Sequence, residues 1–203
     1  MKIICVGRNY VDHAKELNNQ VPTEPVIFLK PETALLQKRN PFFIPTFSRD
    51  VHHELELVVR IDRLGKSIEE RFAHRYYREV SVGIDFTARD VQAALKSKGL
   101  PWEKAKAFDG SAPVGSFVPL KELGDVQALD IHLTKNGDTV QSVNTSEMIF
   151  SVNHVISHVS QFMTLKMGDL IFTGTPAGVG PVAENDVLEC FLGERPLLKV
   201  KVK

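Results

Sequence analysis

Two glutamates stand two positions apart in the apolar segment HHELELVV, residues 52–59. Because the side chains of a strand alternate between its two faces, Glu54, Glu56 and Val58 are expected to share one face. A strand with one buried and one solvent-exposed face would explain the pattern most simply. The other explanation is that both carboxylates converge on one ligand, and the rest of the chain decides between the two.

A third carboxylate, Asp85, lies in a second strand-like segment, residues 80–86, and a helix between the two segments could bring their strands side by side. Same-face positions two apart are separated by roughly 7 Å, close enough for two carboxylates to bind one ion. Three oxygen donors without a nearby Cys or His favour a hard cation, Mg²⁺ or Mn²⁺, over zinc. The alternative is that Asp85 merely helps to cap the helix that follows it.

Three carboxylates around one divalent ion leave about one negative charge uncompensated, so basic side chains are expected nearby. The candidates are Arg89, Lys106 and Lys30.

His13 and Glu16 lie three positions apart on an expected short helix, where a glutamate can orient an imidazole and stabilise its charged form. This arrangement suits a general base, although such a pair is commonly a solvated surface contact. The Asn- and Pro-rich residues 18–25 that follow predict an irregular segment. Lids over active sites come from segments of this kind.

Two further motifs are weaker indications of a functional site. Residues 172–181, FTGTPAGVGP, form a glycine-rich turn whose backbone N–H groups could face an anion, but a plain turn explains them equally well. His154 and His158 lack both the glutamate of H-E-x-x-H and a third ligand, so they are expected to be surface histidines.

Composition restricts the class of protein. The chain has 203 residues, 43% of them hydrophobic, and is expected to form one domain over residues 1–203. Lys plus Arg equals Asp plus Glu at 25 each, which argues against nucleic-acid and membrane partners. Only two cysteines, no signal-peptide pattern and no apolar run of membrane-spanning length indicate a soluble, cytoplasmic protein.

Predicted strands outnumber predicted helices, which indicates a β-rich α+β fold. Strands are expected at residues 3–6, 80–86 and in the C-terminal tail, and Asn136-Gly137 predicts a type I′ hairpin. Residues 26–30 form a short apolar run bracketed by prolines. Helices are expected at about residues 11–17, from Ser67 with Glu70 completing a capping box, and from a cap within residues 87–90 to Gly99. Another helix is expected to bury Val155, Ile156, Val159, Phe162 and Met163.

Several segments together resemble the fumarylacetoacetate hydrolase family: GRNYVDHAKE, EPVIFLKP, HHELELVV, GIDFTARDVQ, GLPWEKAKAFDGSAPVG, NTSEMIFS and GDLIFTGTPAGVGP. The resemblance keeps the motif order nearly end to end and is greatest to the acylpyruvase and oxaloacetate decarboxylase branch. It implies the family's mixed β-sandwich roll, usually as a homodimer. The extra N-terminal domain of fumarylacetoacetase is not expected here, which argues against fumarylacetoacetate as the substrate.

The resemblance also assigns roles to individual residues. A magnesium or manganese ion would be held by Glu54, Glu56 and Asp85. A water-activating dyad would consist of His13 and Glu16, with Lys106 facing the substrate. The substrate's carboxylate end would be held by Arg89, Gln92 and Thr175, with Lys30 as a further member.

The implied substrate is a small 2-oxo acid, which can chelate a divalent ion through its carboxylate and keto oxygens. We expect hydrolysis of acylpyruvates, decarboxylation of oxaloacetate, or both, through a metal-bound pyruvate enolate. One alternative is an isomerase, hydratase or decarboxylase of aromatic-acid breakdown products, such as 2-hydroxyhepta-2,4-diene-1,7-dioate. Another is a non-catalytic protein in which the carboxylates hold a structural ion.

Overall fold

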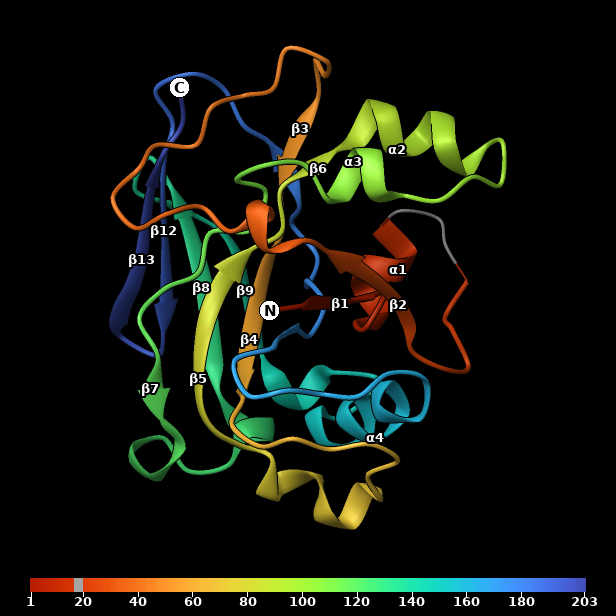
Figure 1. Ribbon diagram of the computed structural model, residues 1–203. Coiled ribbons are helices and arrows are strands. Elements are labelled where there is room, and N and C mark those ends of the chain that lie inside the picture. Colours follow the sequence, from red (N-terminus) through yellow and green to blue (C-terminus); the bar gives the residue numbers. More distant parts are fainter. Residues whose placement is uncertain (17–19) are drawn as a thin grey trace.

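The computed structural model describes residues 1–16 and 20–203 and shows an α+β architecture, as predicted (Figure 1). The strands are β1 Ile3–Gly7, β2 Val26–Lys30, β3 Val51–His53, β4 Leu55–Ile61, β5 Tyr77–Ile84, β6 Thr87–Ala88, β7 Val118–Pro119, β8 Asp130–Lys135, β9 Asp138–Asn144, β10 Leu170–Phe172, β11 Gly180–Pro181, β12 Val187–Leu192 and β13 Arg195–Lys201. The α-helices are α1 Val11–Glu16, α2 Arg89–Lys96, α3 Glu103–Lys106 and α4 Val152–Phe162. Five short 3-10 helices cover Glu32–Ala34, Glu70–Arg75, Leu120–Glu122, Val126–Ala128 and Thr145–Glu147.

The strands form three sheets. The largest has the order β2-β1-β10-β4-β5-β7, in which β1 and β10 run parallel and the other neighbours run antiparallel. A four-stranded antiparallel sheet has the order β13-β12-β8-β9, and a small one has the order β11-β3-β6. Strand β4 is interior to the largest sheet, between β10 and β5, so both of its edges are paired.

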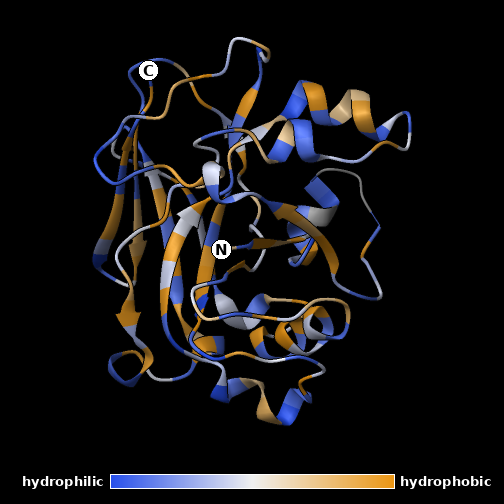
Figure 2. Cartoon of the chain, in the orientation of Figure 1, coloured by the Kyte–Doolittle hydropathy of each residue, from blue (hydrophilic) through white to orange (hydrophobic). Residues whose placement is uncertain are grey.

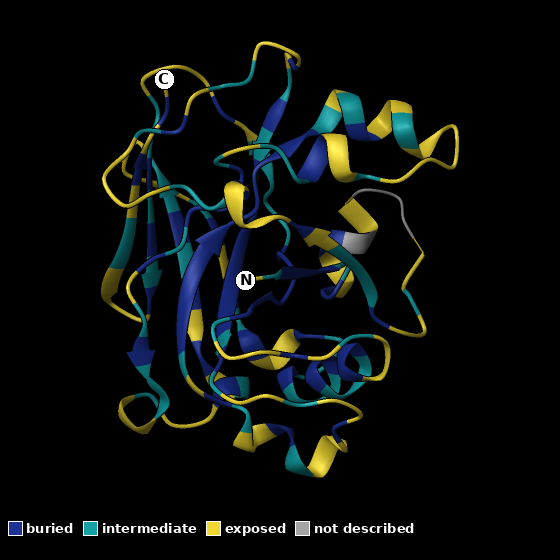
Figure 3. Ribbon diagram, in the orientation of Figure 1, coloured by how far each residue is buried: buried dark blue, intermediate teal, exposed yellow. Residues whose placement is uncertain are grey.

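Both faces of β4 are buried, because different groups of apolar side chains cover them. Leu57 and Val59 belong to the main core, which also contains Ile131 of the four-stranded sheet. Val58 points the other way, into a second cluster with Phe172. Figure 3 shows β4 and β5 almost entirely buried, and Figure 2 shows hydrophobic residues along the same strands. Polar side chains on the Val58 face are therefore withheld from bulk water.

Burial of both faces contradicts the simplest explanation of the glutamate pattern. Glu54 and Glu56 are only 4% and 2% exposed, so the expected solvent-exposed face does not exist. The expectation that they share one face is met, since one carboxylate oxygen of each belongs to the same small cluster. Alternation of polar and apolar residues correctly placed the two glutamates on one face. It did not reveal that this face is buried, because distant segments of the chain cover it.

The predicted helix start at Ser67 is wrong, and the predicted cap within residues 87–90 is correct in position but lacks a side-chain cap hydrogen bond. Helix α2 begins after Ala88 without a side-chain cap; the hydroxyl of Thr87 instead accepts a hydrogen bond from Lys106 at 2.6 Å. Ser67 has a φ of +51°, and its N–H donates to the carbonyl of Ser160 in α4. The segment after Ser67 therefore forms only the short 3-10 helix Glu70–Arg75.

The remaining element predictions were mostly correct. The hairpin at Asn136-Gly137 has positive φ at both residues, 56° and 96°, as a type I′ turn requires. Helix α4 buries most of its predicted face, but Phe162 is 63% exposed. His154 lies at the surface, where its Nδ1 is 3.0 Å from Glu70. The predictions for Leu17 and for residues 18 and 19 lie outside the described residues.

None of the helices within residues 1–16 and 20–203 is both long enough and apolar enough to cross a bilayer.

Asn9 connects three segments next to the end of β1. Its fully buried amide donates to the carbonyls of Phe150 and Thr173 at 3.0 and 2.8 Å, and its oxygen accepts from the Phe150 N–H at 2.7 Å. Asn9→Ala would leave these buried backbone groups unpaired, so we expect the free energy of unfolding to fall by about 2–5 kcal/mol. Urea unfolding measures this change. The exposed control Asn40→Ala should change it by less than about 0.5 kcal/mol, and an equal effect of both variants would contradict the assignment.

Candidate active site

Three carboxylates meet where β4 and β5 lie side by side. Glu54 stands between β3 and β4, Glu56 lies within β4, and Asp85 follows the last residue of β5. Pairing of Leu55 with Ile84 places the two strand ends together, and the N–H of Asp85 donates to the carbonyl of Glu54 at 2.8 Å. One oxygen from each carboxylate lies within 4.8 Å of the other two. Within residues 1–16 and 20–203, this is the one group of acidic, His or Cys side chains with such spacing.

Cations surround Glu54. The Lys106 ammonium donates to Glu54 Oε2 and to Asp85 Oδ2, both at 2.7 Å, and the Arg89 guanidinium lies 2.5 Å from Glu54 Oε1. Burial alone would raise the pKa of Glu54, but the attraction of Lys106 and Arg89 outweighs it and holds the pKa well below its usual value. Burial would lower the pKa of Lys106, but Asp85 and Glu54 raise it. Both groups are therefore ionised at neutral pH.

Lys106 uses all of its ammonium hydrogens on this chain. Besides the two carboxylates, it donates to the hydroxyl of Thr87 at 2.6 Å. The predicted role of facing a substrate would require one of these bonds to be exchanged. Arg89 also donates to Gln92 at 2.8 Å, so the two predicted carboxylate-binding residues already orient each other.

Lys30 is fully buried next to Asp85, with its Nζ 2.7 Å from Asp85 Oδ1. Its hydrogens are directed to the carbonyl of Lys106 and to the carbonyl and hydroxyl of Ser111. The structure therefore places Lys30 against a predicted metal ligand and away from the cavity surface, and its predicted contact with substrate stays a prediction.

The carboxylates retain the acceptor sites that a hard cation needs. Asp85 Oδ1 is buried and receives no hydrogen bond, although Lys30 lies close to it. Glu56 accepts one hydrogen bond, from the Gly174 N–H at 2.6 Å, and forms none of the ion pairs in the described part of the chain. Burial, followed by repulsion from Asp85 and Glu54, raises the pKa of Glu56 well above its usual value. Three converging oxygens, one of them without a donor, fit a Mg²⁺ or Mn²⁺ ion.

The glycine-rich turn after β10 supplies N–H groups to acids of this chain. Gly174 donates to Glu56, and Gly178 donates to Glu16 Oε1 at 3.1 Å. Gly174 has a φ of +100°, and a Cβ there would lie 2.7 Å from the Cβ of Asn9. Only glycine allows this approach, so the turn has a specific role in fixing two carboxylates.

His13 and Glu16 form the predicted dyad on α1. Their Nδ1 and Oε2 atoms are 3.2 Å apart. His13 is only 5% exposed and is therefore not a solvated surface group, whereas Glu16 is exposed. Burial lowers the pKa of His13, and Glu54 and Glu16 oppose this shift only in part. Since a carboxylate only accepts, the neutral ring donates through Nδ1–H and keeps its lone pair on Nε2. His13 is therefore equipped to act as a base.

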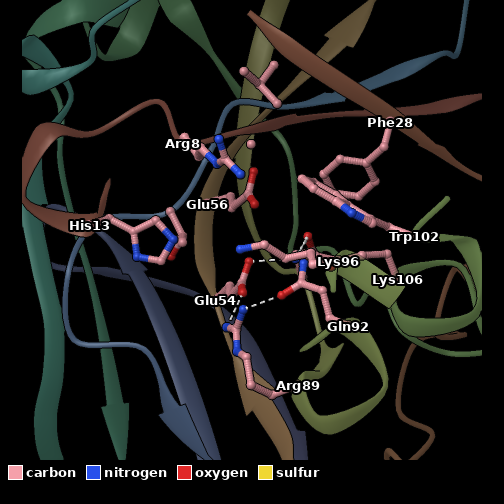
Figure 4. Close-up of a pocket in the computed structure, with 14 residues that line it drawn as sticks. Arg8, His13, Phe28, Glu54, Glu56, Arg89, Gln92, Lys96, Trp102 and Lys106 are labelled. Atoms are coloured by element: carbon pink, nitrogen blue, oxygen red, sulfur yellow. Dashed lines mark hydrogen bonds and ion pairs between the residues drawn. The ribbon is translucent and has the colours of Figure 1, made fainter. Parts of the chain in front are cut away.

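A cavity joins these groups (Figure 4). Its lining includes eight of the ten predicted site residues: His13, Glu54, Glu56, Asp85, Arg89, Gln92, Lys106 and Thr175. Glu16 stands behind His13, and Lys30 stands next to Asp85. The roles assigned to all ten residues remain predictions, since the structure establishes only where they lie.

Six lining residues were not predicted as site residues: Val6, Gly7, Arg8, Phe28, Lys96 and Trp102. Arg8 has a φ of +61°, unusual for a residue other than glycine, and follows the end of β1. Partial burial and the neighbouring Arg8 and Arg89 lower the pKa of Lys96, which shows that positive charge accumulates at this wall. In the sequence, the position of Arg8 directly after a predicted strand was the one feature that could have identified a lining residue.

Comparisons with known proteins agree with this geometry. A family profile described as "Fumarylacetoacetate (FAA) hydrolase C-terminal" matches residues 2–203. The Mus musculus protein named oxaloacetate tautomerase FAHD1, mitochondrial, is 47% identical over 99% of this chain and 91% of its own length. A Dictyostelium discoideum protein named oxaloacetate decarboxylase, mitochondrial, is 44% identical over 93% of this chain and 87% of its own.

A solved structure extends the likeness to the fold. The crystal structure of fumarylpyruvate hydrolase from Pseudomonas aeruginosa in complex with Mn²⁺ and pyruvate has a TM-score of 0.92 with this chain. It is 35% identical, and the match covers 100% of this chain and 89% of that one.

The chain therefore belongs to the fumarylacetoacetate hydrolase family, a family of enzymes. This confirms the predicted family and its fold. The names of the relatives include decarboxylation and hydrolysis, both of which were expected from the sequence, and also tautomerisation, which was not.

The raised pKa of Glu56 predicts that metal binding is coupled to proton release. Where Glu56 keeps its proton, a dication must displace it, so Mn²⁺ affinity should rise as pH rises toward the raised pKa. Calorimetric titration of Mn²⁺ in two buffers of different ionisation enthalpy measures the protons released. We expect release of up to about one proton per ion, and less release as the pH rises through the raised pKa of Glu56. Glu56→Gln should release none, and equal release by the two proteins would contradict the assignment.

Proposed function

We propose that this chain is a divalent-metal-dependent enzyme of small 2-oxo acids, with oxaloacetate as its substrate. Two reactions of oxaloacetate share one event: negative charge develops on the C2 oxygen as either a proton or carbon dioxide leaves C3. Loss of the proton gives tautomerisation, and loss of carbon dioxide gives decarboxylation. The names of the mouse and Dictyostelium relatives support this choice of substrate.

The charge balance of the buried cluster is the observation that carries the proposal. Three carboxylates are matched by three cations, which are Lys30, Arg89 and Lys106. A bound dication would therefore leave the site with a net charge of about +2, and Arg8 and Lys96 add positive charge at the cavity wall. A dicarboxylate such as oxaloacetate brings two negative charges and would neutralise the cluster.

The triad residues Glu54, Glu56 and Asp85 would hold a Mg²⁺ or Mn²⁺ ion. Such an ion supplies Lewis-acid stabilisation of negative charge on the keto oxygen of a chelating 2-oxo acid. Arg89 and Gln92 line the same cavity and would orient a substrate carboxylate. Val6, Phe28 and Trp102 form the apolar part of the wall and would limit access of water to the reacting carbon.

His13 would move the proton. Its Nε2 lone pair can remove a proton from C3 of oxaloacetate as the C2–C3 double bond forms. The same proton can return to the C2 oxygen, which completes tautomerisation without a net change in charge. Glu16 holds the ring through Nδ1, and the Gly178 N–H holds Glu16 in turn. Decarboxylation needs no such base, because the electrons of the breaking C3–C4 bond pass directly toward C2.

Hydrolysis of acylpyruvates is the second candidate. The neutral, oriented His13 can equally take a proton from water as it attacks the distal carbonyl. The fumarylpyruvate hydrolase relative favours this possibility. The compartment and the oligomer also remain proposals: we expect a cytoplasmic homodimer that binds neither nucleic acid nor membranes.

Replacement of one metal-binding carboxylate tests the proposed cofactor. Glu56→Gln keeps the shape of the side chain but removes its charge, so we expect Mn²⁺ affinity and turnover of oxaloacetate to fall at least about tenfold. Calorimetry and a coupled assay measure the two quantities. Glu122→Gln, at an exposed acid outside the cavity, is the control and should change neither. Full activity of Glu56→Gln in metal-replete buffer would refute the proposed cofactor site.

Replacement of the base separates the reactions. His13→Ala should slow tautomerisation and acylpyruvate hydrolysis by about 10²–10⁴-fold, whereas decarboxylation should lose much less. Parallel assays with oxaloacetate and acetylpyruvate measure all three rates. Equal losses would contradict the role of His13. Turnover of a hydroxy-heptadienedioate alone would favour an aromatic-acid enzyme, and no turnover of any 2-oxo acid would favour a non-catalytic protein.

A further inference from the structure

Gln141 connects the outer four-stranded sheet to the cavity, although it does not line it. It lies on β9, is only 1% exposed, and its amide contacts two segments that carry site residues. Its Oε1 accepts from the N–H of Leu55 at 2.9 Å and lies 3.1 Å from Nδ1 of His53. Its Nε2 donates to the hydroxyl of Thr175 at 2.9 Å and to the carbonyl of Pro176 at 3.1 Å.

The orientation of this amide is determined by its backbone partners. The N–H of Leu55 can only donate, so the atom facing it must be the amide oxygen. The carbonyl of Pro176 can only accept, so the atom facing it must be the amide nitrogen. A flipped amide would bring two donors together on one side and two acceptors together on the other. All four hydrogen-bonding positions of Gln141 are thus occupied in one arrangement.

This orientation fixes the role of the Thr175 hydroxyl. Since the amide nitrogen of Gln141 only donates, the hydroxyl oxygen must accept, and its own hydrogen must point elsewhere. Thr175 is 3% exposed and lines the cavity, and its hydroxyl donates to no acceptor among residues 1–16 and 20–203. The free hydrogen is therefore available to an acceptor inside the cavity.

We propose that Gln141 is a positioning residue that makes Thr175 a hydrogen-bond donor to the carboxylate of a bound 2-oxo acid. This inference rests on the proposed function for the identity of the ligand. Gln141 acts through Thr175 without contacting the ligand, and it couples the outer sheet to the geometry of the cavity. A hydroxyl with a fixed direction loses less entropy on binding than one that rotates freely.

Gln141→Met tests the inference, because methionine has a similar length and no charge but cannot donate to Thr175. We expect the KM for oxaloacetate to rise about tenfold, the loss typical of one hydrogen bond to a charged group, while kcat changes less than about threefold. Binding of oxalate to the Mn²⁺-loaded protein, measured by calorimetry, should weaken by a similar factor. Affinity for Mn²⁺ itself should stay within about threefold.

A double-mutant cycle with Thr175→Val separates positioning from a structural role. If Gln141 acts through Thr175, Gln141→Met should weaken oxalate binding in the wild-type background and have no further effect on it in Thr175→Val. Any loss of stability should appear in both backgrounds. Gln127 is a matched control, since its amide also bridges two backbone groups, Val152 N–H and the Thr145 carbonyl, away from the cavity. Gln127→Met should leave oxalate binding unchanged.

The outcomes separate this inference from the proposed function. A wild type that binds oxalate with Mn²⁺ but turns over no oxaloacetate would refute the function and leave the positioning of Thr175 to be decided by the binding cycle. Additive effects of the two substitutions, or unchanged oxalate binding in Gln141→Met, would overturn the inference. A fall in Mn²⁺ affinity as large as the fall in oxalate affinity would also overturn it, since Gln141 would then act through β4. Absence of oxalate binding to the Mn²⁺-loaded wild type would also overturn the inference about Gln141.

Discussion

The burial of three carboxylates at one point of the largest sheet is the constraint on which the rest of the structure depends. Removing an ionised carboxylate from water costs several kcal/mol even after the protein relaxes. Glu54, Glu56 and Asp85 are all less than 5% exposed, so each must be compensated locally. Nearby cations and one glycine N–H supply that compensation, and Glu56 is the group for which it is least complete.

The fold holds the three carboxylates in fixed positions. Strand β4 has paired strands on both edges and apolar layers on both faces, so the side chain of Glu56 has a fixed direction and faces the cavity. Segments distant in sequence then complete the site. Helix α1 carries the dyad, β2, α2 and α3 carry the cations, and the turn after β10 fixes two acids through Gly174 and Gly178 (Figure 1). Strand β4 therefore contributes both to the hydrophobic core and to the polar cluster.

The sequence predicted the local features and missed those that depend on distant neighbours. Period-two alternation placed Glu54 and Glu56 on one face, and Asn136-Gly137 identified a hairpin, because both are properties of a few adjacent residues. The burial of that face could not be predicted, since the second layer arises from several other segments. The helix start within residues 87–90 was predicted correctly, but the side-chain cap hydrogen bond is absent, and the Thr87 hydroxyl accepts from Lys106 instead. Gln141 gave no signal either, since its partners lie 34 or more positions away.

The metal site is tested most directly by anomalous X-ray diffraction from crystals soaked in Mn²⁺ and oxalate. We expect one strong anomalous peak among the carboxylates of Glu54, Glu56 and Asp85, with oxalate in contact with it and with the hydroxyl of Thr175. Absence of a peak at the carboxylates, or a peak that other side chains hold, would show that the three carboxylates do not bind the ion.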